Sequence, residues 1–195
     1  MKRLSQVIVA GLLSLPTMGA QQAASHDAVA DQFVDMSSWS ATRIAAYRKR
    51  VELHRKPEAM LRIPSIELVV PVFDGTSAAI LDQAAGRIEG TSRFGASGNT
   101  GIAAHRDGFF RALRDVQVGD LLQVDLPDAT LTYTVVSTRV VDPSETRVLR
   151  ATAEPTITLV TCYPFYFSGP APQRFIVRAT RAPEPEEIRL SRVSD

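Results

Sequence analysis

The chain has 195 residues, 45% of them hydrophobic, which is enough for one sizeable core but hardly for two. Its 22 basic and 21 acidic residues leave a formal net charge of +1, so no net field draws it to nucleic acid or to an acidic polymer. A single cysteine excludes an intramolecular disulfide, and three widely separated histidines give no zinc-ligand spacing. We therefore expect one domain with appendages, without a nucleic-acid partner, a metal or a cofactor.

The first residues have the features of an export signal. Lys2 and Arg3 give a positive start, and Val7 to Leu15 form a short apolar run before a group of small residues. That run is shorter than the ~20 residues that span a bilayer, while Met18 stands where a small residue would favour cleavage. We predict an exported protein in which residues 1–20 are either cleaved or kept as a membrane anchor. The remainder would then lie outside the cytoplasm, in the periplasm or beyond the cell.

Residues 21–57 are predicted to form a stalk followed by an amphipathic helix. The stretch from Gln21 to Ser38 is rich in Ala, Gln, Asp and Ser and has no strong periodicity, which is typical of a flexible segment. Ser40 is suited to cap the helix, apolar positions recur three or four residues apart beyond it, and Pro57 ends it. The many basic residues of this helix either form a solvated face or contact anionic lipid near the anchor.

After Pro57 the sequence changes to short runs rich in Val, Ile, Leu and Thr that are separated by Gly, Pro and Asp. Seven or eight strands at this spacing predict an all-β fold, a closed or nearly closed barrel over residues 58–182. Short helices are expected at Ser77 to Ala84 and around Phe109 to Arg114. The end of the chain, residues 183–195, contains prolines and mixed charge and is expected to be a mobile tail. The expected strands are MLRIPSI, LVVPVFDG, NTGIAAH, DLLQVDL, LTYTVVSTRVV, PTITLVTC and RFIVRAT.

The only cysteine, Cys162, ends the run TITLVTC just before the loop YPFYFSGPAPQ. In a strand, Thr158, Val160 and Cys162 share one face while Thr161 belongs to the other. A lone cysteine in a strand is most often a small buried hydrophobe. However, the end of a strand beside a proline-stiffened loop is also a place where a thiol is held rigidly and stays open to substrate.

A reactive thiol needs partners, because a free cysteine titrates at about pH 8.5 and only the thiolate is the nucleophile. His105 ends the apolar run GIAAH and precedes a turn, so it also lies at a strand end; the alternative is an ordinary surface histidine. Arg174 opens the strand RFIVRAT. If that strand pairs with TITLVTC as a hairpin, Arg174 returns close to Cys162; the alternative is an edge arginine in a surface ion pair.

The surroundings of these three residues resemble the signature motifs of sortases. The sortase TLxTC motif appears as TLVTC at residues 158–162, and the histidine motif appears as GIAAHRDGFF at residues 101–110, with Ala104 where many members have glycine. The arginine segment appears as APQRFIV at residues 171–177. The motifs occur in family order within a match from about Ala59 to Arg181. The TCYPF extension and the AP-x-RFIV ending are most similar to class D sortases.

This resemblance implies the eight-stranded sortase β-barrel, with short helices and an N-terminal helix, and a cysteine transpeptidase activity. By the resemblance, Cys162 attacks the threonine carbonyl of an LPxTG-like sorting signal and forms a thioester acyl-enzyme. His105 then acts as acid and base, and Arg174 stabilises the oxyanion or holds the substrate backbone. Thr161 is expected to bind substrate or shape the oxyanion site, through its backbone rather than its hydroxyl. Asp107 could steer His105, but it stays outside the catalytic set.

The implied substrate is a secreted protein with a C-terminal LPxTG-like signal, and the sequence does not identify the amine that accepts it. Two other functions stay open. A thiol hydrolase would use the same Cys, His and Arg and deliver the acyl group to water. A binding module on the same barrel would capture an extracellular peptide while the cysteine is merely buried. A thiol inert to alkylating reagents would favour the binding module.

Overall fold

The computed structural model describes residues 34–49, 53, 55–166 and 169–181. The expected export signal or anchor at residues 1–20, the first part of the stalk and the expected tail at residues 183–195 lie outside this described part. Within the described residues, no helix is both long enough and apolar enough to cross a membrane.

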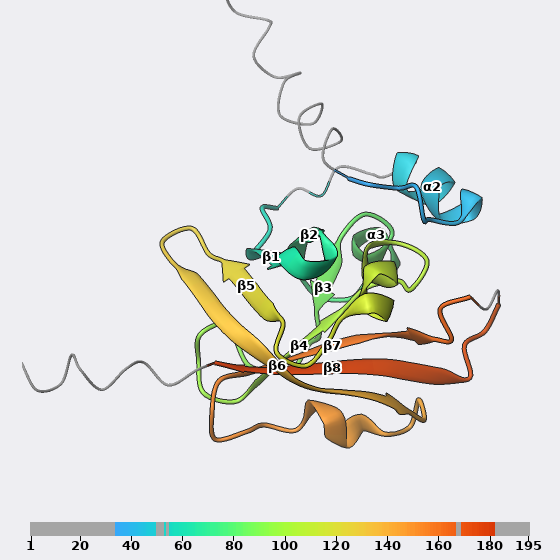
Figure 1. Ribbon diagram of the computed structural model, residues 1–195. Helices are drawn as coiled ribbons and strands as arrows, with labels where there is room; N and C mark the ends of the chain where they lie inside the picture. The colour runs from blue at the N-terminus through green and yellow to red at the C-terminus, as the bar shows by residue number, and fades with distance from the viewer. Residues whose placement is uncertain (1–33, 50–52, 54, 167–168, 182–195) are drawn as a thin grey trace, which may run out of the picture. The chain divides into compact units, whose positions relative to one another are not determined.

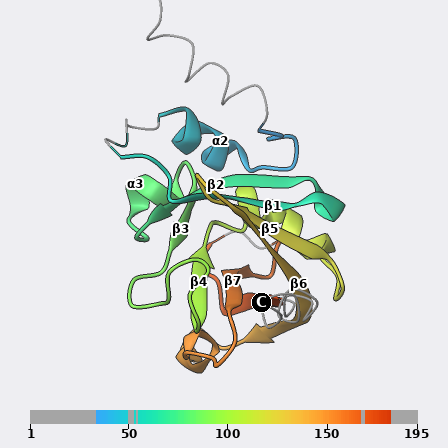
Figure 2. The same ribbon diagram turned by 90° about the vertical axis from the view of Figure 1, so that its left-hand side faces the viewer.

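Eight strands, counted within the described residues, close into one barrel, in the order β1-β2-β3-β4-β7-β8-β6-β5. In Figure 2 the strands follow one another around a ring. The pairing of β1 with β5 completes this ring. The strands are β1 (Ala59–Ile63), β2 (Leu68–Asp74), β3 (Ala85–Arg87), β4 (Asn99–Ala103), β5 (Leu121–Asp125), β6 (Thr130–Val141), β7 (Thr156–Tyr163) and β8 (Gln173–Arg181).

Two of the strand pairs are parallel, and the others are antiparallel. β2 pairs with β3 and β4 pairs with β7 in parallel, whereas β7 and β8 form an antiparallel hairpin. Figure 1 shows β7 and β8 running side by side, with their connecting loop at the right of the view. A parallel pair places the two carboxyl ends at the same edge of the sheet, so the residues that follow β4 and β7 come together.

The barrel interior is filled by the alternate residues of each strand. Along β6, one of the expected strands, Leu131, Tyr133 and Val135 are buried while Thr132 and Val136 are exposed, because successive side chains of a strand point to opposite faces. Branched side chains dominate the rest of the core, as expected of strands that fit a closed barrel. Fully buried core residues include Leu61, Ile63, Val70, Ile102, Leu122, Ile157 and Leu159.

Short helices cover parts of the barrel. The helix α3 (Ala78–Leu81) follows Ser77, and the 3₁₀ helix η2 (Phe109–Asp115) follows the histidine motif, at the two places where short helices were expected. Two further 3₁₀ turns, η1 (Pro64–Ile66) and η3 (Thr146–Leu149), lie in loops. The all-β prediction with short helices is therefore confirmed.

The N-terminal helix α2 (Ala41–Arg48) begins where the sequence predicted but ends earlier. Ser40 caps it by accepting a hydrogen bond from the Arg43 amide, as expected. Its end at Arg48 makes the prediction of a helix reaching Pro57 wrong. A short isolated helix has little stability of its own, and the chain beyond α2 instead serves tertiary contacts: Leu53 packs against the cluster of Phe73, Ile80 and Ala84.

Candidate active site

Cys162 is the next-to-last residue of β7, and it is partly accessible. In the β7–β8 hairpin its Cα partner is Arg174, the second residue of β8. Residues directly opposite each other in an antiparallel pair project to the same face, with Cβ atoms about 4.5–5.5 Å apart. The structure therefore brings Arg174 and Cys162 to one face at one end of the hairpin.

His105 reaches the same end of the barrel through the parallel pair of β4 and β7. The last registered pair of these strands is Ala103 with Val160, and His105 and Cys162 each lie two residues farther along. The Thr161 hydroxyl reinforces this junction, because it is buried and donates a 2.8 Å hydrogen bond to the Ala104 carbonyl. The Thr161 hydroxyl therefore connects the end of β7 to the residue that follows β4.

The His105 imidazole lies in a partly buried, charged environment. Its side chain is 33% exposed. Burial lowers the pKa of His105 below its usual 6.5, and the positive charge of Arg43 lowers it further, while the Asp107 and Asp82 carboxylates act in the opposite direction. The balance favours the neutral imidazole in the free enzyme.

Asp107, the residue considered for steering His105, is held by groups of the N-terminal segment. Its carboxylate accepts hydrogen bonds from the Ser40 hydroxyl at 3.0 Å and from the Arg43 Nε at 3.1 Å. Burial would raise the pKa of Asp107, but the charge of Arg43 and these hydrogen bonds outweigh it and leave the pKa below 3.8. Asp107 is therefore an ionised carboxylate two residues from the imidazole.

Two charged residues beside His105 were missed by the sequence analysis. Asp82, just after α3, places its Oδ1 atom 3.8 Å from His105 Nε2, and Arg43 of α2 donates to that same Oδ1 at 2.6 Å. Arg43 was treated only as one of several basic residues of a helix. Because these contacts join residues 23 to 62 positions from His105 in the chain, no local sequence pattern marks them.

The Arg174 side chain is partly buried and faces its own loop. Its Nη1 donates to the carbonyls of Ala171, at 3.3 Å, and Gln173, at 3.0 Å. These contacts orient the guanidinium at the base of the β7–β8 loop. A guanidinium carries five N–H donors, so hydrogen bonds through Nη1 leave donors that a substrate oxygen can use.

Two arginines of the histidine loop, the segment from Ala104 through η2 that follows β4, bind the β7–β8 loop. The buried Arg106 donates to the carbonyl of Pro164 at 3.2 Å and to that of Gly169 at 2.7 Å. Arg111 donates to the Phe165 carbonyl at 2.7 Å. The loop after Cys162 is thus tied to the loop that carries His105, which keeps the two sides of the site in a defined arrangement.

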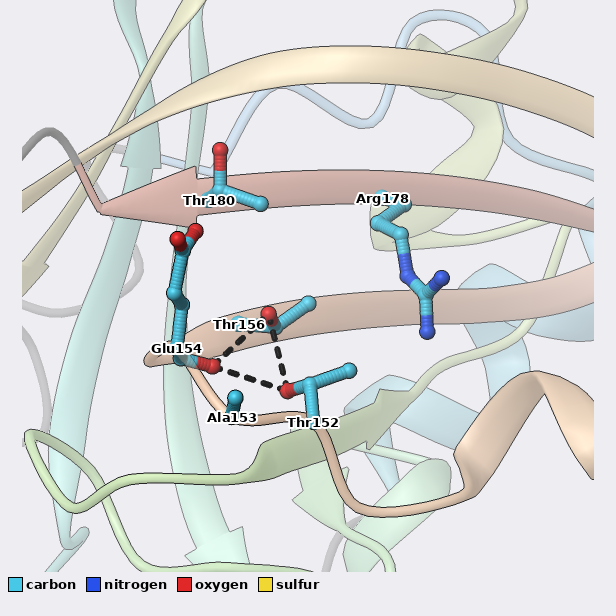
Figure 3. A pocket seen from close by; sticks show the side chains of 6 residues that line it. All are labelled: Thr152, Ala153, Glu154, Thr156, Arg178 and Thr180. Carbon is cyan, nitrogen blue, oxygen red and sulfur yellow. Dashed lines mark hydrogen bonds between the residues drawn. The ribbon is translucent and has the colours of Figure 1, made fainter.

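A separate hollow of about 220 Å³ lies away from these residues. Figure 3 shows its lining, where the hydroxyls of Thr152 and Thr156 bond to each other and to the Glu154 carbonyl. Thr156 is the first residue of β7, at the opposite end of the strand from Cys162. This hollow is therefore distinct from the site. Its lining residues are Thr152, Ala153, Glu154, Thr156, Arg178 and Thr180.

The residues at the carboxyl ends of β4 and β7 form a set suited to acyl transfer. A partly accessible thiol, an imidazole and a guanidinium converge there, and these are the groups that a nucleophile, an acid and base, and an oxyanion donor require. Among the described residues, no group of three or more His, Cys, Asp or Glu side chains is placed to hold a metal ion. The arrangement is that of a thiol-dependent acyl-transfer enzyme.

Comparison with known proteins assigns the family. A protein-family model described as Sortase domain matches residues 61–182. Sortase D of Bacillus subtilis (strain 168) is 30% identical over 148 residues, which cover 73% of this chain and 75% of that protein. The chain therefore belongs to the sortase family.

Solved structures agree with this assignment. The crystal structure of sortase C1 from Streptococcus agalactiae matches with a TM-score of 0.62 and 28% identity, over 75% of this chain and 78% of that chain. The sortase D5 transpeptidase of Clostridium perfringens matches with a TM-score of 0.60 and 25% identity, over 78% and 95% of the two chains. The sortase-type barrel is confirmed, and the relatives named sortase D and D5 agree with the class D features of the sequence. Family membership makes the chain a cysteine transpeptidase of a family associated with the cell surface.

Proposed function

We propose that this chain cleaves an LPxTG-like sorting signal of a secreted protein and transfers the protein to an amine. The observation that supports this most is the convergence of three sequence-predicted residues through two different strand pairings. The parallel register of β4 and β7 carries His105 to Cys162, and the antiparallel register of β7 and β8 carries Arg174 to it.

In the first half of the reaction, the Cys162 thiolate attacks the carbonyl carbon of the signal's threonine. A C–S bond forms, and the peptide bond to the following residue breaks as the tetrahedral intermediate collapses. His105, as imidazolium, donates a proton to the departing amine. The product is a thioester between Cys162 and the substrate protein.

In the second half, an amine attacks the thioester carbonyl. His105, now neutral, accepts a proton from this amine, and the C–S bond breaks to release the Cys162 thiolate and a new amide. The lowered pKa of His105, which follows mainly from burial, suits the step in which the imidazole accepts a proton. Attack in the first half needs the opposite protonation state, so only a minor fraction of the free enzyme is ready to react.

Arg174 is proposed to donate hydrogen bonds to the oxyanion that forms on the threonine carbonyl. Its position directly opposite Cys162, and the orientation of its guanidinium by the Ala171 and Gln173 carbonyls, support this role. For Thr161, the engagement of the hydroxyl with Ala104 supports a contribution through the backbone at most.

The proposed setting is outside the cytoplasm, with residues 1–20 as an export signal or membrane anchor. The proposed domain division is the one expected from sequence: a stalk and helix over residues 21–57, the catalytic barrel over residues 58–182 and a tail at residues 183–195. A secreted substrate must be exported as well, so enzyme and substrate would meet at the cell surface.

Hydrolysis is the alternative reaction, because water could replace the amine in the second half. A direct test supplies the full chain with a fluorescent LPxTG-type peptide and a panel of amines: glycine peptides, a lysine side-chain amine and a cell-wall peptide. Mass spectrometry then separates the transfer product from the hydrolysed acid. We expect an amine-dependent transfer product and its loss in Cys162→Ala.

Two outcomes would contradict this proposal. Release of the acid alone with every amine would make the chain a thiol hydrolase. An intact peptide, together with a Cys162 thiol that is inert to iodoacetamide, would favour the binding module.

A further inference from the structure

Arg43 is a largely shielded link between three separate segments of the chain. Its side chain is only 14% exposed. From α2, its Nη1 donates to Asp82 Oδ1 at 2.6 Å and its Nε donates to Asp107 Oδ1 at 3.1 Å. Asp82 follows α3 and Asp107 lies two residues after His105, so one planar guanidinium bridges two carboxylates from separate segments near the imidazole.

Independent contacts hold this arginine in place. The Trp39 ring packs edge-on against Phe109 of the histidine loop, with centroids 4.8 Å apart, and Tyr47 packs against both rings. The Arg43 stem lies over Gly108, where an added Cβ would come within 3.3 Å of it. The start of α2 is therefore packed directly on the loop that carries the imidazole.

Arg43 and His105 face the same carboxylate oxygen. Asp82 Oδ1 lies 3.8 Å from His105 Nε2, which is beyond hydrogen-bonding distance, and 2.6 Å from Arg43 Nη1. The Asp82 carboxylate is thus hydrogen-bonded to the Arg43 guanidinium and is too far from the imidazole to accept a hydrogen bond from it. Without Arg43, this oxygen would be available to take the imidazole N–H and hold it in a direct ion pair.

We propose that Arg43 is a positioning residue for the transfer reaction, which keeps Asp82 bound to itself so that this carboxylate does not capture His105, while Arg43 and Ser40 together hold Asp107. This inference rests on the proposed role of His105 as acid and base. Arg43 has no assigned contact with a reacting atom; it acts through the carboxylates that it binds and through its own positive charge near His105.

The charged groups that face His105 set the direction of its response. They are Arg43 from α2, Asp82 after α3 and Asp107 two residues farther along the chain, and the Cys162 thiol lies at the end of the neighbouring strand β7. Arg43→Gln removes the cation that lowers the pKa of His105 and frees the Asp82 carboxylate, which raises it, while Ser40 still binds Asp107. Both changes raise the pKa of His105, so the imidazole of the variant should stay protonated up to a higher pH than in the wild type.

The test uses the full 195-residue chain and four variants. Arg43→Gln removes the bridge, Arg43→Lys keeps the charge, and Arg43→Gln with Asp82→Asn also removes the competing carboxylate. Arg48→Gln is the matched control, since Arg48 is an exposed arginine of the same helix. NMR titration follows the His105 ring signal, assigned by its absence in His105→Ala, and single-turnover acylation by an LPxTG peptide is measured across pH.

We expect Arg43→Gln to raise the pKa of His105. The larger imidazolium fraction would by itself favour acylation, but displacement of the imidazole from the reacting atoms should outweigh it and slow acylation by up to ~10²-fold, with little change in KM. The limb of the pH profile that reports His105 should move to higher pH with it. Arg43→Lys keeps the charge but loses the planar fork that reaches both carboxylates, so its effect should be smaller than that of Arg43→Gln. The double variant should recover most of the lost rate, which a merely structural role of Arg43 would not produce.

Docking of α2 is checked in each variant by the fluorescence of Trp39, the only tryptophan of the chain. A red shift of the emission in Arg43→Gln would mean that Trp39 is exposed and α2 is no longer docked. In that case Asp82→Asn is measured instead, because it keeps the Arg43–Asp107 pair. This variant must lower the pKa of His105, because it removes a carboxylate that raises it. An unchanged titration in Asp82→Asn would overturn the proposal.

Three results contradict the inference when α2 stays docked. In the first, Arg43→Gln has the His105 pKa and the acylation rate of the wild type. In the second, Arg48→Gln changes both quantities as much as Arg43→Gln does. In the third, the double variant acylates no faster than Arg43→Gln. Failure of the proposed function is a different result, because the wild-type chain would then form no acyl-enzyme while the His105 titration could still be measured.

Discussion

At the scale of single residues, the pairing of Cys162 with Arg174 leads to a kinetic prediction. Arg174→Lys keeps the positive charge but loses the planar fork of donors. We expect kcat to fall by a factor of the order of 10² to 10³, as on removal of an oxyanion donor, with a much smaller change in KM. Single-turnover kinetics with an LPxTG-type peptide measure both.

Arg178→Lys is the control, since Arg178 lies four residues along β8 on the same face and pairs with Thr158 instead. Wild-type acylation with weakened affinity in Arg174→Lys would make Arg174 a substrate clamp and would refute its oxyanion role.

His105 also makes a prediction about stability against pH. Its folded pKa lies below 6.5, mainly because the ring is buried, so between these two values the unfolded chain binds more protons than the folded one. The free energy of unfolding should therefore fall as the pH drops from 6.5 toward the folded pKa, and His105 should add no pH dependence above that window. Urea denaturation at successive pH values measures this slope. In His105→Gln the slope should be smaller; an equal slope would place the titrating group elsewhere.

At the scale of elements, the junction of β4 and β7 depends on one buried hydroxyl. Thr161→Val removes the hydrogen bond to the Ala104 carbonyl and leaves that acceptor unsatisfied, which costs roughly 1–3 kcal/mol. Thr158→Val is the matched control: it removes a buried 2.8 Å hydrogen bond to Asn99 on the same two strands, farther from the site. Denaturant unfolding should report a similar loss of stability in both variants.

Acylation should slow only in Thr161→Val, because only that hydroxyl fixes the residues next to His105 and Cys162. Equal acylation rates in the two threonine variants would show that the hydrogen bond between Thr161 and Ala104 has no specific role in catalysis.

The long strands and the order of the site residues could be predicted from sequence, because alternation along β6 and the hairpin of β7 and β8 are local patterns. β3 could not, since three residues that include Gly86 are too short to show a period. The end of α2 was also mispredicted, because an apolar spacing that continues toward His54 does not reveal that Leu53 packs on the barrel.

The surroundings of His105 were even less accessible to sequence analysis. Asp82 and Arg43 act on it through contacts between α2, α3 and the histidine loop, which only the folded arrangement defines. The site residues themselves were found because their motifs surround strand ends. The groups that control their charge carry no such motif.

At the scale of the whole molecule, the account predicts activity without a metal ion. Near β3, the buried Arg87 guanidinium binds the carboxylates of Glu58, at 2.7 Å, and Asp74, and so supplies the positive charge between them. Transfer activity should be the same in EDTA as in buffer. Activity that is lost in EDTA and restored by calcium would contradict this and would reveal a carboxylate site that binds calcium.

The central claim is that Cys162 carries the substrate as a thioester. The most direct measurement is the intact mass of the full chain after rapid mixing with an LPxTG-type peptide and acid quenching. The account predicts an added mass equal to the peptide up to its threonine, located on Cys162, removed by hydroxylamine and absent in a folded Cys162→Ala. Cleavage of the peptide by Cys162→Ala, or an adduct on any other residue, would contradict it.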